Sequence, residues 1–187
     1  FIDPARRKDS QRVFRLEDCE PNVIDLKDLF FEKAERVLIK TAPLLDIRQT
    51  LNDLQAVKEV HVIAVNNDCK EVLYLLEKDF TGEAQIFCVN LKKGHKEEFR
   101  FTLSEERETI APYSEPLKYI YEANAAIMKA GAFKSIACKY KLYKLHQHSH
   151  IYTSELLMSD KIETLFLEVK KMYDYIIVDT APVGIVS

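Results

Sequence analysis

The scarcity of glycine is the feature that most restricts what this chain can fold into and bind. Among its 187 residues only four are glycine, and no two of the four lie close together. A dinucleotide-binding fingerprint or a Walker A loop needs clustered glycines, because the backbone there must approach a phosphate without side chains in the way. The sequence therefore contains no recognisable loop for cradling a nucleotide.

The remaining composition is that of an ordinary soluble, globular protein. Hydrophobic residues make up 47%, charged residues 30%, and the net charge is −3, so no overall charge draws the chain to nucleic acid or to a membrane. No apolar run approaches the roughly 20 residues that would span a bilayer. The cysteines are widely spaced and form no C-x-x-C pair; they are Cys19, Cys69, Cys88 and Cys138. Since no secretory signal is visible, we expect reduced thiols, a cytoplasmic protein and no structural zinc.

The first third of the chain alternates between strand and helix patterns. Residues 1–2, 37–39 and 60–65 are short apolar runs of the kind that form buried strands. Amphipathic segments separate them, one beginning after Pro21 with apolar residues at helical spacing and a shorter one over 47–54. This order predicts an α/β fold, namely the C-terminal half of a Rossmann-like sheet.

The middle of the chain predicts strands and a hairpin. We expect a strand over 71–76 because turn residues bracket it on both sides. The alternating runs 85–91 and 98–103 flank Lys93 and Gly94, and this arrangement is typical of a hairpin.

A loop with two prolines, Pro112 and Pro116, follows and marks a candidate domain boundary. Beyond it we expect a helix over 124–139 and extended chain over 142–153. A small α+β module is therefore predicted to follow the first sheet.

The first residues carry the clearest candidate chemistry. Asp3 and Pro4 follow an apolar pair that ends a predicted strand, and ligands of α/β sheets gather outside such carboxyl ends. A carboxylate there can hold a substrate amine or hydroxyl, and the nearby Arg6 and Arg7 can bind a phosphate group. The alternative is that Asp3 only caps the next turn and that both arginines are solvated. From the residues alone, both interpretations stay open.

Several long segments closely resemble one enzyme family. Residues 1–7, which read FIDPARR, together with 15–47, 60–76 and 119–155, resemble class I S-adenosylmethionine-dependent methyltransferases with a THUMP-like C-terminal domain, typical of Bacteroidetes. The resemblance thus extends over roughly residues 1–155. It implies half of a Rossmann-like methyltransferase sheet followed by a small α+β module that is ferredoxin-like or THUMP-like.

The resemblance also implies roles for individual residues. In such enzymes the acidic-Pro motif after the fourth strand lines the pocket for the methyl-accepting atom, so Asp3, Pro4, Arg6 and Arg7 are the expected catalytic residues. Lys40 ends the fifth strand and is expected to contact the substrate. The expected cofactor is S-adenosylmethionine. The family's glycine-rich cofactor loop would lie upstream of the first residue, in agreement with the scarcity of glycine, so we expect this chain alone to have negligible activity.

A basic and aromatic stretch points to the class of substrate. Five lysines alternate with aromatic residues; the set is Lys129, Lys134, Lys139, Lys141 and Lys144 with Phe133, Tyr140 and Tyr143. Such a pattern suits phosphate contact and base stacking, and THUMP domains elsewhere bind RNA, so we expect Lys129, Lys134 and Tyr140 to contact RNA, such as tRNA or rRNA. A solvated helix face explains the same residues equally well.

A run of alternating histidines raises the question of a metal site. If the chain is extended there, His146, His148 and His150 share one face and could ligate a transition metal. No cysteine or carboxylate cluster accompanies them, so we expect local hydrogen bonds and no bound metal.

The last residues resemble a different family. A predicted helix beginning at Ser159 leads to a strand over 173–182, and this segment is similar to the Walker B region of bacterial capsular-polysaccharide tyrosine autokinases. There Asp179 would correspond to the acidic residue that helps to hold magnesium. The phosphate loop of such kinases is absent, so we favour a core strand and suspect that two unrelated gene pieces join near Ser154.

These observations predict three parts and one main function. Residues 1–80 are expected to be the C-terminal part of a methyltransferase domain, 81–155 a ferredoxin-like or THUMP-like module, and 156–187 a kinase-like tail. The expected function is that of a methyltransferase fragment directed at RNA. The alternatives are a non-catalytic RNA-binding module, a fragment of a polysaccharide-biosynthesis tyrosine kinase, which is less favoured, and an inert chimera.

Overall fold

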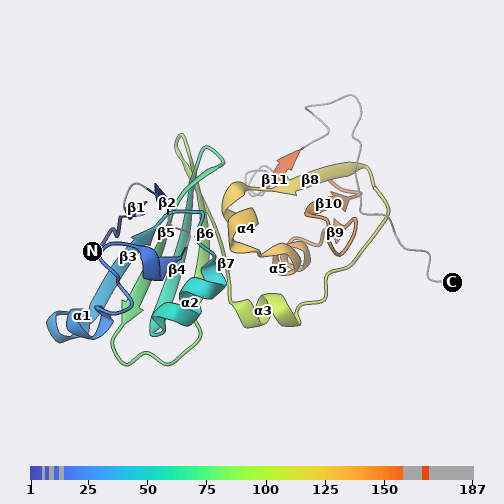
Figure 1. The fold of residues 1–187 in the computed structure, drawn as a ribbon. Coiled ribbons are helices and arrows are strands. Elements are labelled where there is room, and N and C mark those ends of the chain that lie inside the picture. Colours follow the sequence, from blue (N-terminus) through green and yellow to red (C-terminus); the bar gives the residue numbers. More distant parts are fainter. Residues whose placement is uncertain (6, 9–10, 13–14, 158–165, 169–187) are drawn as a thin grey trace.

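A five-stranded sheet and a four-stranded sheet lie side by side and form the body of the protein (Figure 1). The computed structural model describes residues 1–5, 7–8, 11–12, 15–157 and 166–168. Within them, the secondary structure is mixed α/β, as the sequence predicts.

The large sheet is mixed and not purely parallel. Its strands in spatial order are β3 (Arg36–Thr41), β5 (Asp68–Glu77), β4 (Val57–Val65), β6 (Gln85–Lys92) and β7 (His95–Phe101). β5 is antiparallel to both β3 and β4, so these two strands run in the same direction, and β4 is parallel to β6. The expected strand–helix–strand order is present, but β5 lies between the two strands because a tight turn at Asn66 and Asn67, both at positive φ, folds it back onto β4.

The hairpin and the middle strand were predicted correctly. β5 contains the predicted 71–76, and β6 and β7 pair around the turn that contains Gly94 (φ +81°). Buried and partly exposed residues alternate along most of these strands because successive side chains point to opposite faces of a sheet. The predicted division at residue 80 stays a prediction; β6 and β7, which follow it, belong to the large sheet.

The first residues of the chain extend the large sheet beyond β3. Ile2 forms a parallel bridge with Ile39, with hydrogen bonds from Ile2 N to Leu38 O (2.8 Å) and from Lys40 N to Ile2 O (2.9 Å). This confirms that Ile2 pairs with the sheet before the chain leaves it at Asp3. The predicted burial of the apolar pair is wrong, because Phe1 is 76% exposed and Ile2 is only partly buried at the margin of the sheet.

The first helix is shorter than predicted. α1 spans Lys27–Lys33, whereas the sequence predicts a start soon after Pro21. The Asn22 side chain accepts a hydrogen bond from Ile24 N (3.0 Å), which offers the backbone a local turn in place of a helical bond. α2 (Ile47–Leu54) agrees with its prediction and begins at Asp46, whose carboxylate accepts a hydrogen bond from Gln49 N (2.8 Å).

The small sheet is antiparallel and belongs to the predicted α+β module. Its strands in spatial order are β11 (Phe166–Glu168), β8 (Tyr119–Ala123), β10 (Ile151–Ser154) and β9 (Tyr143–Lys144). The predicted helix over 124–139 is two helices, α4 (Ala125–Ala130) and α5 (Phe133–Lys139), because Gly131 lies at φ +77° and ends the first of them.

The remaining elements are short and lie outside the two larger sheets. They are β1 (Arg7–Lys8), β2 (Gln11–Arg12), the 3₁₀ turn η1 (Leu16–Asp18) and α3 (Leu103–Glu108). α3 begins with a capping box, in which Thr102 and Glu105 satisfy each other's backbone N–H groups.

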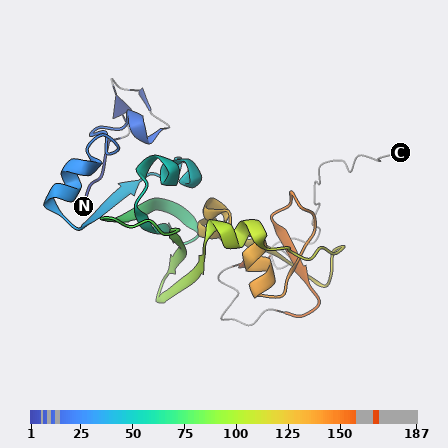
Figure 2. The same cartoon turned by 90° about the horizontal axis from the view of Figure 1, so that it is seen from below.

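Helix α4 joins the two sheets through one continuous core. It contacts β4, β5 and β6 of the large sheet, and it follows β8 of the small sheet directly (Figures 1 and 2). Ala126 and Ile127 are fully buried, and the buried cluster extends from Leu16 to Tyr152. The module is therefore packed against the first sheet and is not merely tethered to it.

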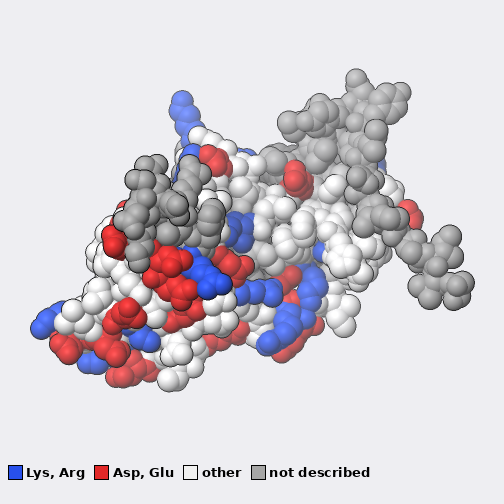
Figure 3. Space-filling model, in the orientation of Figure 1, with Lys and Arg blue, Asp and Glu red and all other residues white. Residues whose placement is uncertain are grey.

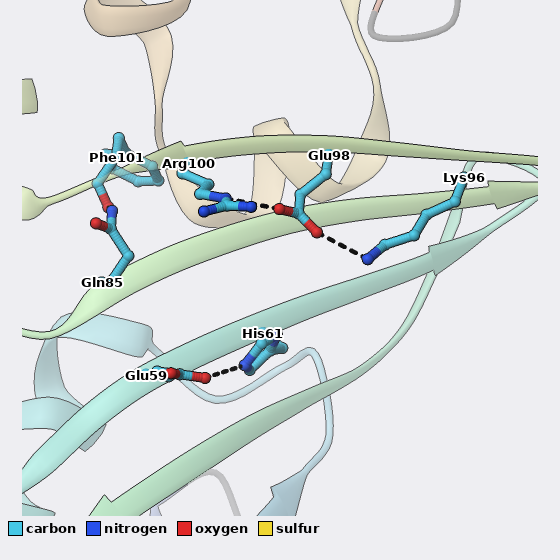
Figure 4. A network of polar contacts seen from close by, with 7 residues as sticks. All are labelled: Glu59, His61, Gln85, Lys96, Glu98, Arg100 and Phe101. Carbon is cyan, nitrogen blue, oxygen red and sulfur yellow. Dashed lines mark hydrogen bonds and ion pairs between the residues drawn. The ribbon is translucent and has the colours of Figure 1, made fainter.

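The other face of the large sheet carries partly exposed side chains in polar contact (Figure 4). His61 and Glu59 lie 2.9 Å apart, and Glu98 accepts a hydrogen bond from Arg100 (2.7 Å). The Phe87 ring stacks on His61 (4.5 Å between centroids), with the Arg100 guanidinium 5.2 Å from its centre. Charged side chains on β7 also make this edge strand a poor template for pairing with another chain.

The predicted tail falls almost entirely outside the described residues. This holds for the helix start at Ser159 and for the strand over 173–182 with Asp179. Residues 166–168 were predicted to be helical, which is wrong, because they pair with β8 as β11. In the described part of the chain, no helix has the length and apolar character needed to cross a membrane.

Candidate functional site

The site predicted from the sequence forms where the first segment leaves the large sheet. Because Ile2 pairs in parallel with Ile39, Asp3 and Pro4 come to lie beside Lys40, near the carboxyl end of β3. Pro4 is buried and Asp3 is exposed. We call this place, made by Asp3, Pro4 and Lys40 with Glu71, the strand-end site.

A lysine between two carboxylates is the chemical centre of the strand-end site. Lys40 Nζ lies 2.5 Å from Asp3 Oδ2 and 4.0 Å from Glu71 Oε2. All three side chains are partly exposed, so the ion pairs contribute at most about 1 kcal/mol to stability. Their effect is to orient the Asp3 carboxylate, which can accept a hydrogen bond from an amine or hydroxyl brought to this edge of the sheet.

Glu71 is a member that the sequence did not reveal. It lies in β5, where Val72 pairs with Thr41 and Leu73 with Lys40, so that Glu71 is a diagonal neighbour of Lys40. The only signal in the sequence is a polar residue at the start of a strand. Nothing local indicates which strand that residue will face.

The structure describes the backbone of only one of the two predicted arginines. Arg6 lies outside the described residues, whereas Arg7 belongs to β1, where its backbone pairs with Arg12. Phosphate binding by Arg6 and Arg7 stays a prediction.

The predicted substrate-binding residues of the module are dispersed. Lys129 Nζ donates a hydrogen bond to Leu45 O (2.8 Å), and Lys134 Nζ donates one to Arg107 O (2.7 Å). Burial lowers the pKa of Lys129, although nearby Asp46 acts in the opposite direction. Of these residues, only Lys129 reaches the loop that follows β3.

Tyr140 and its neighbouring lysines also contact the protein itself. The Tyr140 ring lies 6.4 Å from the Phe99 ring, and burial raises the pKa of its hydroxyl. Lys139 Nζ lies 4.9 Å from the centre of the Phe99 ring. Lys144 is only 2% exposed and donates a hydrogen bond to Gln147 O (3.1 Å). The basic stretch is therefore not one continuous exposed surface.

The surface charge agrees with this picture. On the face shown in Figure 3, acidic side chains gather over the part that carries α1 and α2, and basic side chains occur among them or in small groups. No extended basic tract crosses the described residues on that face.

The histidine run is a turn and not an extended strand. Ser149 N donates a hydrogen bond to His146 O (3.1 Å), and the His150 ring stacks on Phe133, 3.8 Å away. The condition for a shared face is therefore not met, because hydrogen bonds within 146–151 turn the chain. Among the residues that the structure describes, no three His, Cys, Asp or Glu side chains gather as they would around a metal ion.

An apolar hollow of about 330 Å³ lies beside α1. Its lining is Phe1, Ile2, Leu29, Phe30, Lys33, Ala34, Arg36 and Val37. It contains no carboxylate or histidine and so offers no group for proton transfer.

Comparison with known proteins agrees with the fold. The chain is similar to a crystal structure described as a "putative methyltransferase" from Porphyromonas gingivalis W83, with 38% identity and a TM-score of 0.77. The match covers 84% of this chain. Over that part the chain shares the fold of the P. gingivalis protein.

The same comparison sets the extent of the similarity. The chain spans 39% of the length of the P. gingivalis protein. Residues 119–160 match the model of a ferredoxin-like domain, which includes α4, α5 and the described strands from β8 to β10. No curated protein matches the chain.

Proposed function

We propose that this chain forms the acceptor side of an S-adenosylmethionine-dependent methyltransferase, with Asp3 as the residue that holds the methyl-accepting group. The observation that carries the proposal is the position of Asp3-Pro4, beside β3 at the carboxyl end of two parallel strands. Similarity to the P. gingivalis protein supports it.

The residues of the strand-end site have distinct roles in this proposal. Asp3 accepts a hydrogen bond from the acceptor amine or hydroxyl, and buried Pro4 stiffens the backbone behind it. Lys40 holds the Asp3 carboxylate in place, and Glu71 holds the Lys40 ammonium from its other side. Arg6 and Arg7 bind a phosphate of the substrate.

The described residues do not fit the methyl donor. A glycine-rich cradle would be expected at this edge, but Gly82 precedes β6, Gly94 turns the hairpin and Gly131 ends α4. We therefore assign no step of the reaction to S-adenosylmethionine in this chain and propose that the chain alone is inactive.

RNA is the proposed substrate, and Arg6, Arg7 and lysines of the module would bind its phosphates. Lys144 is buried and the Lys129 ammonium is bonded to Leu45 O, so the module contacts that we propose are the partly exposed Lys134 and Tyr140.

Two binding measurements test the proposal. Calorimetry of this chain with S-adenosylmethionine is expected to show no micromolar binding, whereas the longer P. gingivalis protein, as a control, is expected to bind. RNA affinity should fall steeply with salt, and fall again for Arg7→Ala, but not for Glu108→Gln. Micromolar binding of S-adenosylmethionine to this chain would contradict the assignment. RNA binding that is insensitive to Arg7→Ala would instead favour a non-catalytic module.

A further inference from the structure

Helix α4 is anchored to the large sheet at both of its ends. At its start, the Asn67 side chain accepts a hydrogen bond from Ala125 N (2.7 Å). Near its end, Lys129 Nζ donates a hydrogen bond to Leu45 O (2.8 Å). One anchor lies in the β4–β5 turn and the other in the loop after β3. A helix of the ferredoxin-like module therefore connects the segments that follow the carboxyl ends of β4 and β3.

The contacts between these anchors leave α4 little room to move. Ala126 and Ile127 are fully buried against the sheet, and the small alanine lets the helix approach the strands closely. Asn67 is itself held, because its N–H donates to the fully buried Asn90 side chain (3.1 Å). The helix is therefore a rigid support at this edge.

The loop that Lys129 contacts begins at the strand-end site. Residues 42–46 follow β3 directly, only two positions beyond Lys40, whose ammonium pairs with Asp3. Leu45 is buried, and Asp46 caps α2, so the loop connects the strand end to the helix behind it. Movement of this loop would displace the carboxyl end of β3.

We propose that Lys129 is a positioning residue for the strand-end site: by holding the loop 42–46, the ferredoxin-like module fixes the carboxyl end of β3 and with it Lys40. The claim that this place receives the methyl acceptor rests on the proposed function, but the mechanical part of the inference does not. Lys129 touches neither Asp3 nor the substrate in this role; it acts through the Leu45 carbonyl.

Lys134 offers a matched control within the same module. Its Nζ also donates to a backbone carbonyl, that of Arg107, at 2.7 Å. This contact joins α5 to the end of α3 and does not reach the large sheet. Lys129→Met and Lys134→Met therefore each remove one lysine–carbonyl bond, but only the first releases the loop.

Hydrogen exchange on the full chain tests the proposal. The amides to follow are Leu45 N, bonded to Ala42 O, and Thr50 N, bonded to Asp46 O. A hydrogen bond from a charged group corresponds to a protection factor of about 10 to 100, so these amides should exchange that much faster in Lys129→Met. Lys129→Arg should retain most of the protection, and Lys134→Met should leave both amides unchanged.

A second readout separates positioning from simple anchoring. The NMR chemical shifts of the Ile2 and Lys40 amides, which make the backbone hydrogen bonds at the strand-end site, are compared in each variant and are expected to change in Lys129→Met only. Uniformly faster exchange over the whole chain, unchanged exchange at 42–50, or unchanged Ile2 and Lys40 shifts would each overturn the proposal. None of these measurements needs a methyl donor or RNA, so the proposed function can fail while this inference stands.

Discussion

Glu106 provides the sharpest test of how the ferredoxin-like module is held together. It lies in α3, is only 4% exposed, and accepts three hydrogen bonds at the start of α5. Its partners are Lys134 N (2.8 Å), Ser135 N (2.9 Å) and the Ser135 hydroxyl (2.6 Å). A buried carboxylate here satisfies backbone donors that the helix itself leaves without partners.

The expected cost of its removal follows from these contacts. Each hydrogen bond to a charged group contributes about 1.5 to 3 kcal/mol, and the three share one carboxylate, so their contributions do not simply add. We expect Glu106→Ala to lower the free energy of unfolding by about 3 to 5 kcal/mol. Glu106→Gln keeps one oxygen acceptor and the side-chain shape, so its cost should be smaller, about 1 to 2 kcal/mol.

Urea unfolding followed by far-UV circular dichroism measures these differences. The matched control is Glu108→Gln, an exposed position on the same short helix, which should change stability by less than about 0.5 kcal/mol. A loss below about 1 kcal/mol for Glu106→Ala would refute the reasoning, because it would mean that water replaces all three bonds at little cost.

Three further predictions concern pH, backbone strain and helix capping. Burial, and secondarily Lys144, lower the pKa of His150, so below about pH 6.5 the unfolded chain binds more protons than the folded one. Stability should therefore fall as the pH drops below about 6.5. The variant His150→Gln should flatten this part of a profile of melting temperature against pH. An equally steep profile in the variant would contradict this. Gly131→Ala places a side chain at φ +77° and should cost about 1 kcal/mol in urea unfolding, whereas no loss would mean that the backbone relaxes freely. Asp46→Ala removes the cap of α2 and should cost about 0.5 to 2 kcal/mol in the same assay, with Asp46→Asn retaining most of the stability.

Local patterns account for the parts of the fold that were predicted correctly. The hairpin of β6 and β7 depends on alternating side chains and a turn with Gly94, and the bounds of α2 follow from an amphipathic run over 47–54, so both are encoded within a few residues. The end of α4 at Gly131 was missed, although the glycine itself was the signal. The early start predicted for α1 is wrong because the Asn22 side chain accepts a hydrogen bond from Ile24 N, which favours a local turn over a helix there.

The candidate site was only partly predictable for a different reason. Asp3 and Lys40 were identified from a resemblance and a strand-end pattern, but their pairing depends on a parallel bridge between segments far apart in the chain. The sequence pattern indicated that Lys144 is a surface cation. It is instead buried, because β9 pairs with β10 and its ammonium donates a hydrogen bond to Gln147 O. Burial of this kind is set by neighbours that are distant in sequence.

By itself, the sequence determined that this chain has no clustered glycines for a nucleotide loop and that Asp3-Pro4 follows a strand-like residue. Both conclusions follow from residue types and local spacing. Only the tertiary structure decided that Lys40 lies between Asp3 and Glu71 and that Lys129 of the module holds the loop after β3. Those contacts depend on which strands pair and where α4 packs, and such choices are made by burying apolar faces over the whole chain.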